Sequence, residues 1–293
     1  MSPDPIKIKV GMPSDPKEIS IEVPEGDPAP YQLGDTHAIV GKPMPRLDAF
    51  AKVTGRAKYT HDMNLPGMLY AKIVTSPYAH ARIKSVDVSE ALKLEGVLAV
   101  ITGHDLPEKF GIMPSTEDEE ALAVDKVRYA GDPLAAVAAA SESLAEKALG
   151  YIDVEYAVLK PILSIEDALA STEESQRIHT WNRHANIQKA VPLEFGDVEG
   201  GFARSDHIFE GIYFYQGNTH LPMEQYCAVG FYGPDDKLTL WSSTQTPHYL
   251  HRALAKALKL PASRIRVIAT PVGGGFGGKS DPFSHAFCVV KLS

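Results

Sequence analysis

The most informative part of this chain is the stretch Val272-Gly273-Gly274-Gly275-Phe276-Gly277-Gly278-Lys279-Ser280, in which five glycines surround one aromatic residue. Because glycine has no Cβ, its backbone amide can approach a ligand more closely than that of any other residue. The run follows residues 263–269, whose alternating pattern predicts a strand, and precedes residues 283–292, whose apolar character predicts a helix. Backbone N–H groups in such a loop, with a helix N-terminus behind them, suit an anionic or oxo-bearing group.

Two better-known glycine loops compete with this interpretation. The spacing from Gly273 to Gly278-Lys279-Ser280 satisfies the phosphate loop of nucleotide hydrolases. However, Phe276 puts a bulky ring where that loop would wrap phosphate, and no acidic strand for Mg²⁺ follows before Ser293. The dinucleotide-binding fingerprint also fails, because it requires a full βαβ unit and a downstream acid that binds the ribose. A flexible glycine turn without a ligand stays open as an alternative.

A second segment, residues 241–248, has the sequence Trp-Ser-Ser-Thr-Gln-Thr-Pro-His. It follows the strand-like residues 237–240 and precedes a helical pattern of leucines between 250 and 260. We therefore expect Gln245 at a strand end, just before a helix begins. Together, Gln245 and the glycine loop resemble the molybdenum hydroxylase family, which includes xanthine dehydrogenases, aldehyde oxidases, carbon monoxide dehydrogenases and 4-hydroxybenzoyl-CoA reductases. The resemblance is to the large, molybdopterin-binding subunit of that family.

Other segments resemble the same subunit in the same order, so the resemblance covers nearly the whole chain. Those that resemble its α/β hammerhead domain are 48–60, 65–70, 76–83, 127–149 and 152–156. Those that resemble the start of its molybdopterin-binding domain are 196–199, 202–206 and 220–224. The resemblance implies an α+β fold, in which an α/β hammerhead domain is followed by an incomplete molybdopterin-binding α+β domain.

Turn and composition signals divide the chain into four parts. These are an N-terminal extension (1–40), the hammerhead domain (41–168), a polar linker (169–185) and the first part of the molybdopterin-binding domain (186–293). Short strands are expected in the extension at 6–10 and 19–23. The family's large subunit normally continues beyond the glycine loop with a second half and a catalytic glutamate. We therefore expect the catalytic glutamate to be absent from this chain. Three explanations stay open: a fragment, the product of a disrupted gene, or one half of a split subunit whose partner chain carries the missing half.

The resemblance also assigns roles to single residues. Gln245 matches the glutamine that hydrogen-bonds the cofactor beside the metal, and an amide suits this role because it both donates and accepts. Gly275-Phe276-Gly277 matches the loop whose backbone N–H groups face the cofactor and the metal's oxo ligand, where they act as preorganised dipoles. No metal ligand is expected from the protein, because the pterin's sulfurs hold the metal. Two simpler alternatives stay open: Gln245 bonds only the next turn, and Phe276 is only a packing anchor.

Ser280 departs from part of the family. Purine hydroxylases carry a glutamate directly after their Gly-Phe-Gly-Gly-Lys, whereas this chain has Ser280 followed by Asp281-Pro282-Phe283-Ser284-His285. The run from 278 to 285 resembles the 4-hydroxybenzoyl-CoA reductase branch, so the predicted reaction is reductive dehydroxylation of this aromatic CoA thioester to benzoyl-CoA. The alternatives are a xanthine/aldehyde-type molybdenum hydroxylase subunit and a truncated remnant without chemistry. His285 is expected to be a polar position on its helix.

Composition sets limits on partners and location. The net charge of −8 provides no basic surface for nucleic acid or acidic membranes, and no apolar run is long enough to cross a bilayer. Residues 1–26 lack the apolar core of a signal peptide, so we expect a cytoplasmic protein. Cys227 and Cys288 are too few to hold an iron–sulfur cluster. The resemblance therefore implies partner subunits that carry iron–sulfur clusters and FAD.

Overall fold

The computed structural model describes residues 6–12, 15–21, 34, 36–111, 117–171, 173, 177–179, 186–193 and 195–293. The chain divides into two compact units, residues 1–57 and residues 58–293. Much of the predicted linker at 169–185 lies outside the described residues.

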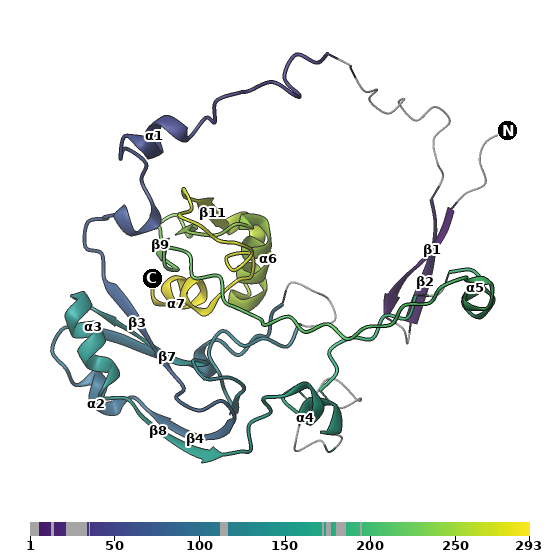
Figure 1. Ribbon diagram of the computed structural model, residues 1–293. Coiled ribbons are helices and arrows are strands. Elements are labelled where there is room, and N and C mark those ends of the chain that lie inside the picture. The colour runs from purple at the N-terminus through teal and green to yellow at the C-terminus, as the bar shows by residue number, and fades with distance from the viewer. Residues whose placement is uncertain are drawn as a thin grey trace. The chain divides into compact units, whose positions relative to one another are not determined.

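In its described residues, the first unit contains a hairpin and a short helix (Figure 1). Strands β1 (Ile6–Met12) and β2 (Asp15–Ile21) pair antiparallel, with Ile6 opposite Ile21. The strand predicted at 6–10 is confirmed and is longer than expected. Of the strand predicted at 19–23, the last two residues lie outside the described part. Helix α1 (Ala49–Val53) follows and has no buried residue.

The second unit begins with two antiparallel three-stranded sheets. The first has the order β3 (Tyr70–Thr75), β7 (Pro133–Ala139), β5 (Val97–Thr102). The second has the order β6 (Lys126–Val127), β4 (Ala81–Asp87), β8 (Asp153–Val158). All residues of the central strand β7 are buried, which explains its unbroken apolar sequence. Its proline stands at the first position, where a missing N–H is tolerated.

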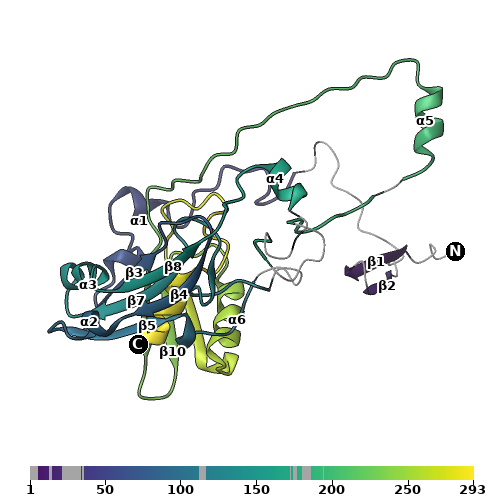
Figure 2. The same cartoon turned by 90° about the horizontal axis from the view of Figure 1, so that it is seen from below.

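Short helices accompany these sheets. Helix α3 (Glu142–Leu149) packs on β3 and β7, and Ser141 caps it by accepting a hydrogen bond from the Leu144 N–H (Figure 2). Helix α2 (Ser89–Leu92) packs on β5, and helices α4 (Ile165–Ala170) and α5 (Val198–Arg204) follow later in the chain. The segment 127–149, which resembles part of the hammerhead domain, thus contains β7 and α3.

A third sheet carries the two segments that resemble the molybdopterin-binding subunit, 241–248 and the glycine loop 272–280. Its order is β11 (Ile265–Ala269), β10 (Leu238–Ser242), β9 (Ala228–Tyr232). Strands β10 and β11 are parallel and are joined through helix α6 (Pro247–Leu258), whereas β9 is antiparallel to β10. Helix α7 (Ser284–Leu292) follows the glycine loop, as predicted. The strand predicted from 263 begins only at Ile265, because 262–264 form a 3₁₀ turn.

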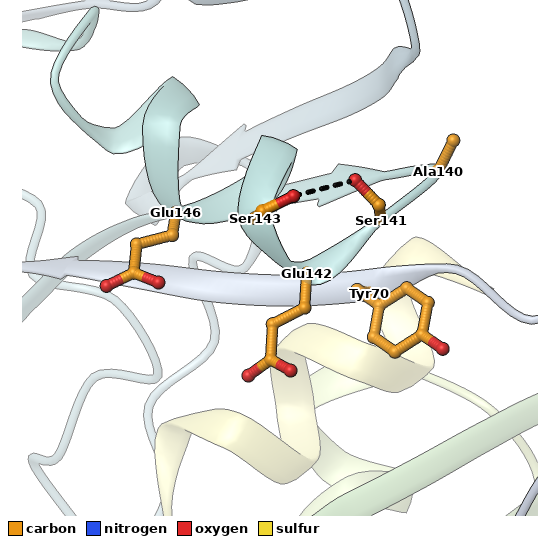
Figure 3. A pocket seen from close by; sticks show the side chains of 6 residues that line it. All are labelled: Tyr70, Ala140, Ser141, Glu142, Ser143 and Glu146. Atoms are coloured by element: carbon orange, nitrogen blue, oxygen red, sulfur yellow. Dashed lines mark hydrogen bonds between the residues drawn. The ribbon is translucent and has the colours of Figure 1, made fainter.

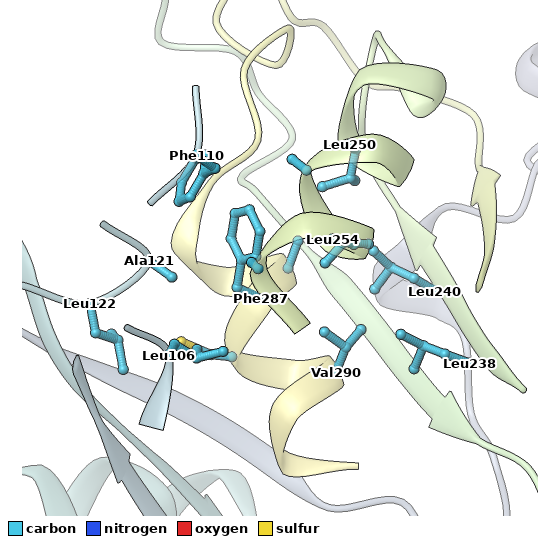
Figure 4. Close-up of a cluster of buried hydrophobic side chains, with 14 of the residues drawn as sticks. Leu106, Phe110, Ala121, Leu122, Leu238, Leu240, Leu250, Leu254, Phe287 and Val290 are labelled. Carbon is cyan, nitrogen blue, oxygen red and sulfur yellow. The ribbon is translucent and has the colours of Figure 1, made fainter. Parts of the chain in front are cut away.

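One apolar cluster joins this third sheet to the preceding sheets (Figure 4). Leu240 of β10, Leu254 of α6 and Phe287 of α7 are fully buried within it. The ring of Phe110, which precedes β6, lies 4.3 Å from the ring of Phe287, centroid to centroid. The cluster explains why residues 58–293 form a single compact unit.

No helix within the described residues is both long enough and apolar enough to span a membrane.

Candidate functional site

Two loops meet at one edge of the third sheet. Because β10 and β11 are parallel, the loops at 243–246 and 270–283 both leave the carboxyl ends of their strands. The Gln245 N–H donates to the Lys279 carbonyl oxygen at 2.9 Å, and the Thr246 hydroxyl donates to the carbonyl oxygen of Ser280. The carboxyl edge is where ligands bind in open α/β sheets.

The side chain of Gln245 spans the two loops. Its Oε1 accepts hydrogen bonds from the N–H groups of Gly277 and Lys279, both at 3.2 Å. Its Nε2 has no hydrogen-bond partner among the described residues, and the side chain is exposed. The structure therefore brings the predicted residues Gln245 and Gly277 together. The N–H groups of this amide nitrogen therefore have no acceptor in the described chain.

Glycine at position 275 allows the close approach of Gln245. A Cβ at this position would lie 2.4 Å from Gln245 Oε1, closer than real Cβ contacts allow. Gly277 has a φ of +85° and Gly274 a φ of +106°, which are conformations that glycine adopts at little cost. The local sequence thus folds this way because glycines stand where other side chains would clash or be strained.

Phe276 lies at the tip of the loop. Its φ of +52° is unusual for a residue with a side chain and costs roughly 1–2 kcal/mol. Its side chain is 73% exposed, which does not support the alternative that it is only a packing anchor.

Three consecutive N–H groups of the loop have no acceptor within the described part of the chain. The N–H groups of Gly274, Gly275 and Phe276 donate to no other described residue, whereas those of Gly273, Gly277 and Gly278 are all hydrogen-bonded. Successive free N–H groups beside a positive φ form a concave donor surface that suits an anionic or oxo-bearing group. Together with the Gln245 amide, these donors fit a polar cofactor.

Two residues from the segment before β9 hold this loop, and sequence analysis gave neither of them a role. Lys279 is buried and ion-paired with Glu224, at 2.6 Å between Nζ and Oε2. The Tyr226 hydroxyl donates to the carbonyl oxygen of Gly278. Because its ammonium points inward, Lys279 cannot reach a phosphate, which argues further against a nucleotide-hydrolase loop. No local pattern could have revealed a partner 55 residues away.

His285 is partly buried near the start of α7 rather than on a solvated face. Burial, with a smaller effect of Lys279, lowers the pKa of His285 to about 4, so the ring is neutral at pH 7. Its ring lies 5.5 Å from that of Tyr226. His285 is therefore a polar position on its helix that the rings of Tyr226 and Phe283 partly cover.

His251 and the two cysteines, Cys227 and Cys288, lie in structural surroundings. The Nε2 of His251 lies 3.0 Å from the Ala262 carbonyl oxygen and 3.1 Å from that of Ile265, which is a structural role. Within the described part of the chain, no group of three His, Cys, Asp or Glu residues could hold a metal. Cys288 is buried, which raises its thiol pKa to about 12, and neither Cys227 nor Cys288 is in a disulfide.

A separate depression lies on the hammerhead part and holds none of the predicted residues (Figure 3). It is lined by Tyr70, Ala140, Ser141, Glu142, Ser143 and Glu146. Glu142 is already paired with Lys72 at 2.7 Å, and the depression is open to solvent. Its chemistry therefore adds nothing to the site at the glycine loop.

Two family models match the chain. Residues 54–160 match the a/b hammerhead domain of aldehyde oxidase and xanthine dehydrogenase. Residues 178–293 match the molybdopterin cofactor-binding domain. The predicted fold, a hammerhead domain followed by a partial molybdopterin-binding domain, is confirmed.

Curated relatives agree with these models. The chain is 39% identical over 260 residues to the nicotinate dehydrogenase large molybdopterin subunit of Eubacterium barkeri, covering 88% of this chain and 60% of that protein. It is 38% identical over 260 residues to a xanthine dehydrogenase molybdenum-binding subunit of Escherichia coli, covering 84% and 34%. The chain thus spans less than two thirds of each of these relatives.

Solved structures are similar over the same part of the chain. Quinoline 2-oxidoreductase from Pseudomonas putida 86 aligns with a TM-score of 0.73 and 31% identity, over 85% of this chain and 32% of that one. The aldehyde oxidoreductase from Desulfovibrio desulfuricans aligns with a TM-score of 0.77 and 26% identity, over 87% and 29%.

Proposed function

The chain belongs to the xanthine dehydrogenase and aldehyde oxidase family, as part of its molybdopterin-binding large subunit, and from this premise we propose that it binds molybdopterin at the glycine loop in a xanthine/aldehyde-type molybdenum hydroxylase. One observation carries the proposal. The N–H groups of Gly274, Gly275 and Phe276 and the amide nitrogen of Gln245 donate to no described residue, and Gly275 lies against the Gln245 side chain at the carboxyl edge of a parallel strand pair.

The residues of the chain then have defined roles. Gln245 Nε2 donates to a polar atom of the cofactor, while its Oε1 holds the loop through Gly277 and Lys279. The N–H groups of Gly274, Gly275 and Phe276 donate to the same group as fixed dipoles that need no reorganisation. When bound, the molybdenum cofactor supplies the oxygen-transfer and electron-accepting chemistry. Gly275 lets the loop approach Gln245, because any side chain there would separate them.

The proposed substrate is a nitrogen-containing aromatic ring or an aldehyde. The relatives that support this class are named for nicotinate, xanthine and quinoline, and for aldehydes in the structure from Desulfovibrio desulfuricans. A second candidate is reductive dehydroxylation of 4-hydroxybenzoyl-CoA. It is favoured by Ser280, which stands where purine hydroxylases carry a glutamate. The relatives favour the first candidate over the second.

We also propose that electrons leave through partner subunits carrying iron–sulfur clusters and FAD. Cys227 and Cys288 are the only cysteines of the chain, and a cluster normally requires four thiolates. The remaining half of the cofactor site, with the catalytic residue, is proposed to come from polypeptide not represented in this sequence, either a continuation or a second chain.

The test is a substrate panel on the complex purified with its partners. Nicotinate, xanthine, quinoline and benzaldehyde are each offered with an artificial electron acceptor, and 4-hydroxybenzoyl-CoA with a low-potential donor. We expect oxidation of at least one of the first four, lost in the Gln245→Ala variant. A molybdenum-loaded complex that reduces only 4-hydroxybenzoyl-CoA would replace the first candidate with the second. A loaded complex inactive on the whole panel would overturn the proposed substrate class.

A further inference from the structure

The side chain of Lys279 turns from the glycine loop into the protein and does not face a ligand. Its side chain has 0% exposure, and its Nζ lies 2.6 Å from Glu224 Oε2 and 2.9 Å from the Glu224 carbonyl oxygen. The Glu224 side chain is only 14% exposed. A buried ammonium without a partner is costly, so Glu224 compensates the burial of Lys279 and fixes its side chain in place.

The same carboxylate also holds the other end of the loop. Glu224 Oε2 accepts a hydrogen bond from the Gly273 N–H at 2.8 Å, and the Glu224 N–H donates to the Gly273 carbonyl oxygen at 3.3 Å. A Cβ on Gly273 would lie 2.7 Å from the Cβ of Glu224, so only glycine permits this approach. One carboxylate oxygen is therefore bonded to both ends of the segment 273–279.

The free donors lie between these two ends. We propose that the Glu224–Lys279 ion pair is a positioning device: it sets the span of segment 273–279 and thereby directs the N–H groups of Gly274, Gly275 and Phe276 toward the bound cofactor. Neither side chain touches the ligand, because both are buried below the loop. The identity of the ligand rests on the proposed function, whereas the control of loop geometry does not.

A pair that only stabilises the fold would behave differently when both charges are removed. Buried ion pairs can often be replaced by apolar residues of similar volume without loss of stability. The double variant Glu224→Met/Lys279→Met keeps the volume but removes both bonds that the Glu224 carboxylate makes to the loop, while the backbone hydrogen bond from the Glu224 N–H to the Gly273 carbonyl oxygen stays. The matched control is Glu117→Met/Lys256→Met, which removes an ion pair of equal length, 2.6 Å, whose side chains are 48% and 44% exposed.

The experiment compares both double variants with the wild-type protein in its complete complex. Amide hydrogen exchange is measured along the chain, together with the molybdopterin content per chain. In Glu224→Met/Lys279→Met we expect exchange at 277–279, whose N–H groups are hydrogen-bonded within the chain, to accelerate by about tenfold or more, and molybdopterin content to fall by about tenfold, with the rest of the chain unchanged. The control variant should match the wild type in both measurements.

Two results would overturn the proposal. One is wild-type exchange and wild-type molybdopterin content in a folded Glu224→Met/Lys279→Met variant. The other is faster exchange across the whole of residues 58–293, which would make the pair a general fold element. If the wild-type complex holds no molybdopterin, the proposed function fails, while loop exchange still decides the positioning role.

Discussion

The substitution Gly275→Ala tests the geometry of the site with one methyl group. The added Cβ would lie 2.4 Å from Gln245 Oε1 and 2.6 Å from Gln245 Cδ. The backbone at Gly275 does not adopt a positive φ, so the change adds a clash and no backbone strain. The Gln245 side chain is exposed and can rotate away, which relieves the clash but breaks its hydrogen bonds to Gly277 and Lys279.

The expected magnitude follows from those two hydrogen bonds. Each contributes about 0.5–1.5 kcal/mol, so the loop should lose about 1–3 kcal/mol of local stability. This corresponds to roughly 5-fold to 150-fold faster amide exchange at Gly277 and Lys279. Cofactor content should fall as well, because the rotated amide no longer stands beside the free N–H groups of the loop.

Hydrogen exchange of the purified complex measures the effect, with Gly201→Ala as the matched control. Gly201 lies in α5, and a Cβ there would meet no atom within 4 Å, so its replacement should leave the loop unchanged. In a Gln245→Ala background, Gly275→Ala should add nothing, because the clashing atoms are gone. The reasoning is refuted if the two substitutions are additive, or if Gly275→Ala exchanges like the wild type.

Three further predictions concern stability. Phe287→Ala should lower the free energy of unfolding by about 3–5 kcal/mol in chemical denaturation, because its fully buried ring joins the sheets; a loss below about 1 kcal/mol would contradict the shared core. Gly230→Ala should cost about 1–3 kcal/mol in the same assay, since its Cβ would lie 2.9 Å from the Val289 carbonyl oxygen; an unchanged midpoint would show that α7 can move aside. For His285, the folded pKa of about 4 lies below its usual 6.5. Its contribution to the free energy of unfolding is therefore fully present above pH 6.5 and is lost as the pH falls toward 4, because the unfolded chain then binds a proton that the folded chain does not. In His285→Gln, the free energy of unfolding should fall by about 3 kcal/mol less between pH 6.5 and pH 4 than in the wild type. Parallel stability profiles of the two proteins over this pH range would exclude protonation of His285 as the cause.

Local patterns in the sequence predicted the elements around the site. Alternation and helical spacing are local properties, so β10, α6 and α7 could be expected where they occur, with Gln245 between a strand and a helix. The approach of Gln245 to the glycine loop was expected only from the family resemblance. It depends on the parallel pairing of β10 and β11, which no local pattern specifies.

Long-range contacts could not be predicted. The ion pair between Glu224 and Lys279 and the packing of Phe110 on Phe287 join residues far apart in the chain. Both are decided by how the elements pack, and composition or periodicity carries no information about them. The neutral, partly buried His285 was missed for the same reason, because its environment comes from Lys279 and Tyr226.

The most direct test of the account is the molybdenum and pterin content of this chain, purified from its host with whatever copurifies. We predict molybdenum and pterin in equal amounts, bound together with the polypeptide that completes the site, and reduced content in Gly275→Ala but not in Gly201→Ala. A purified wild-type complex that contains neither molybdenum nor pterin would contradict the central claim that the glycine loop and Gln245 form part of a molybdopterin site.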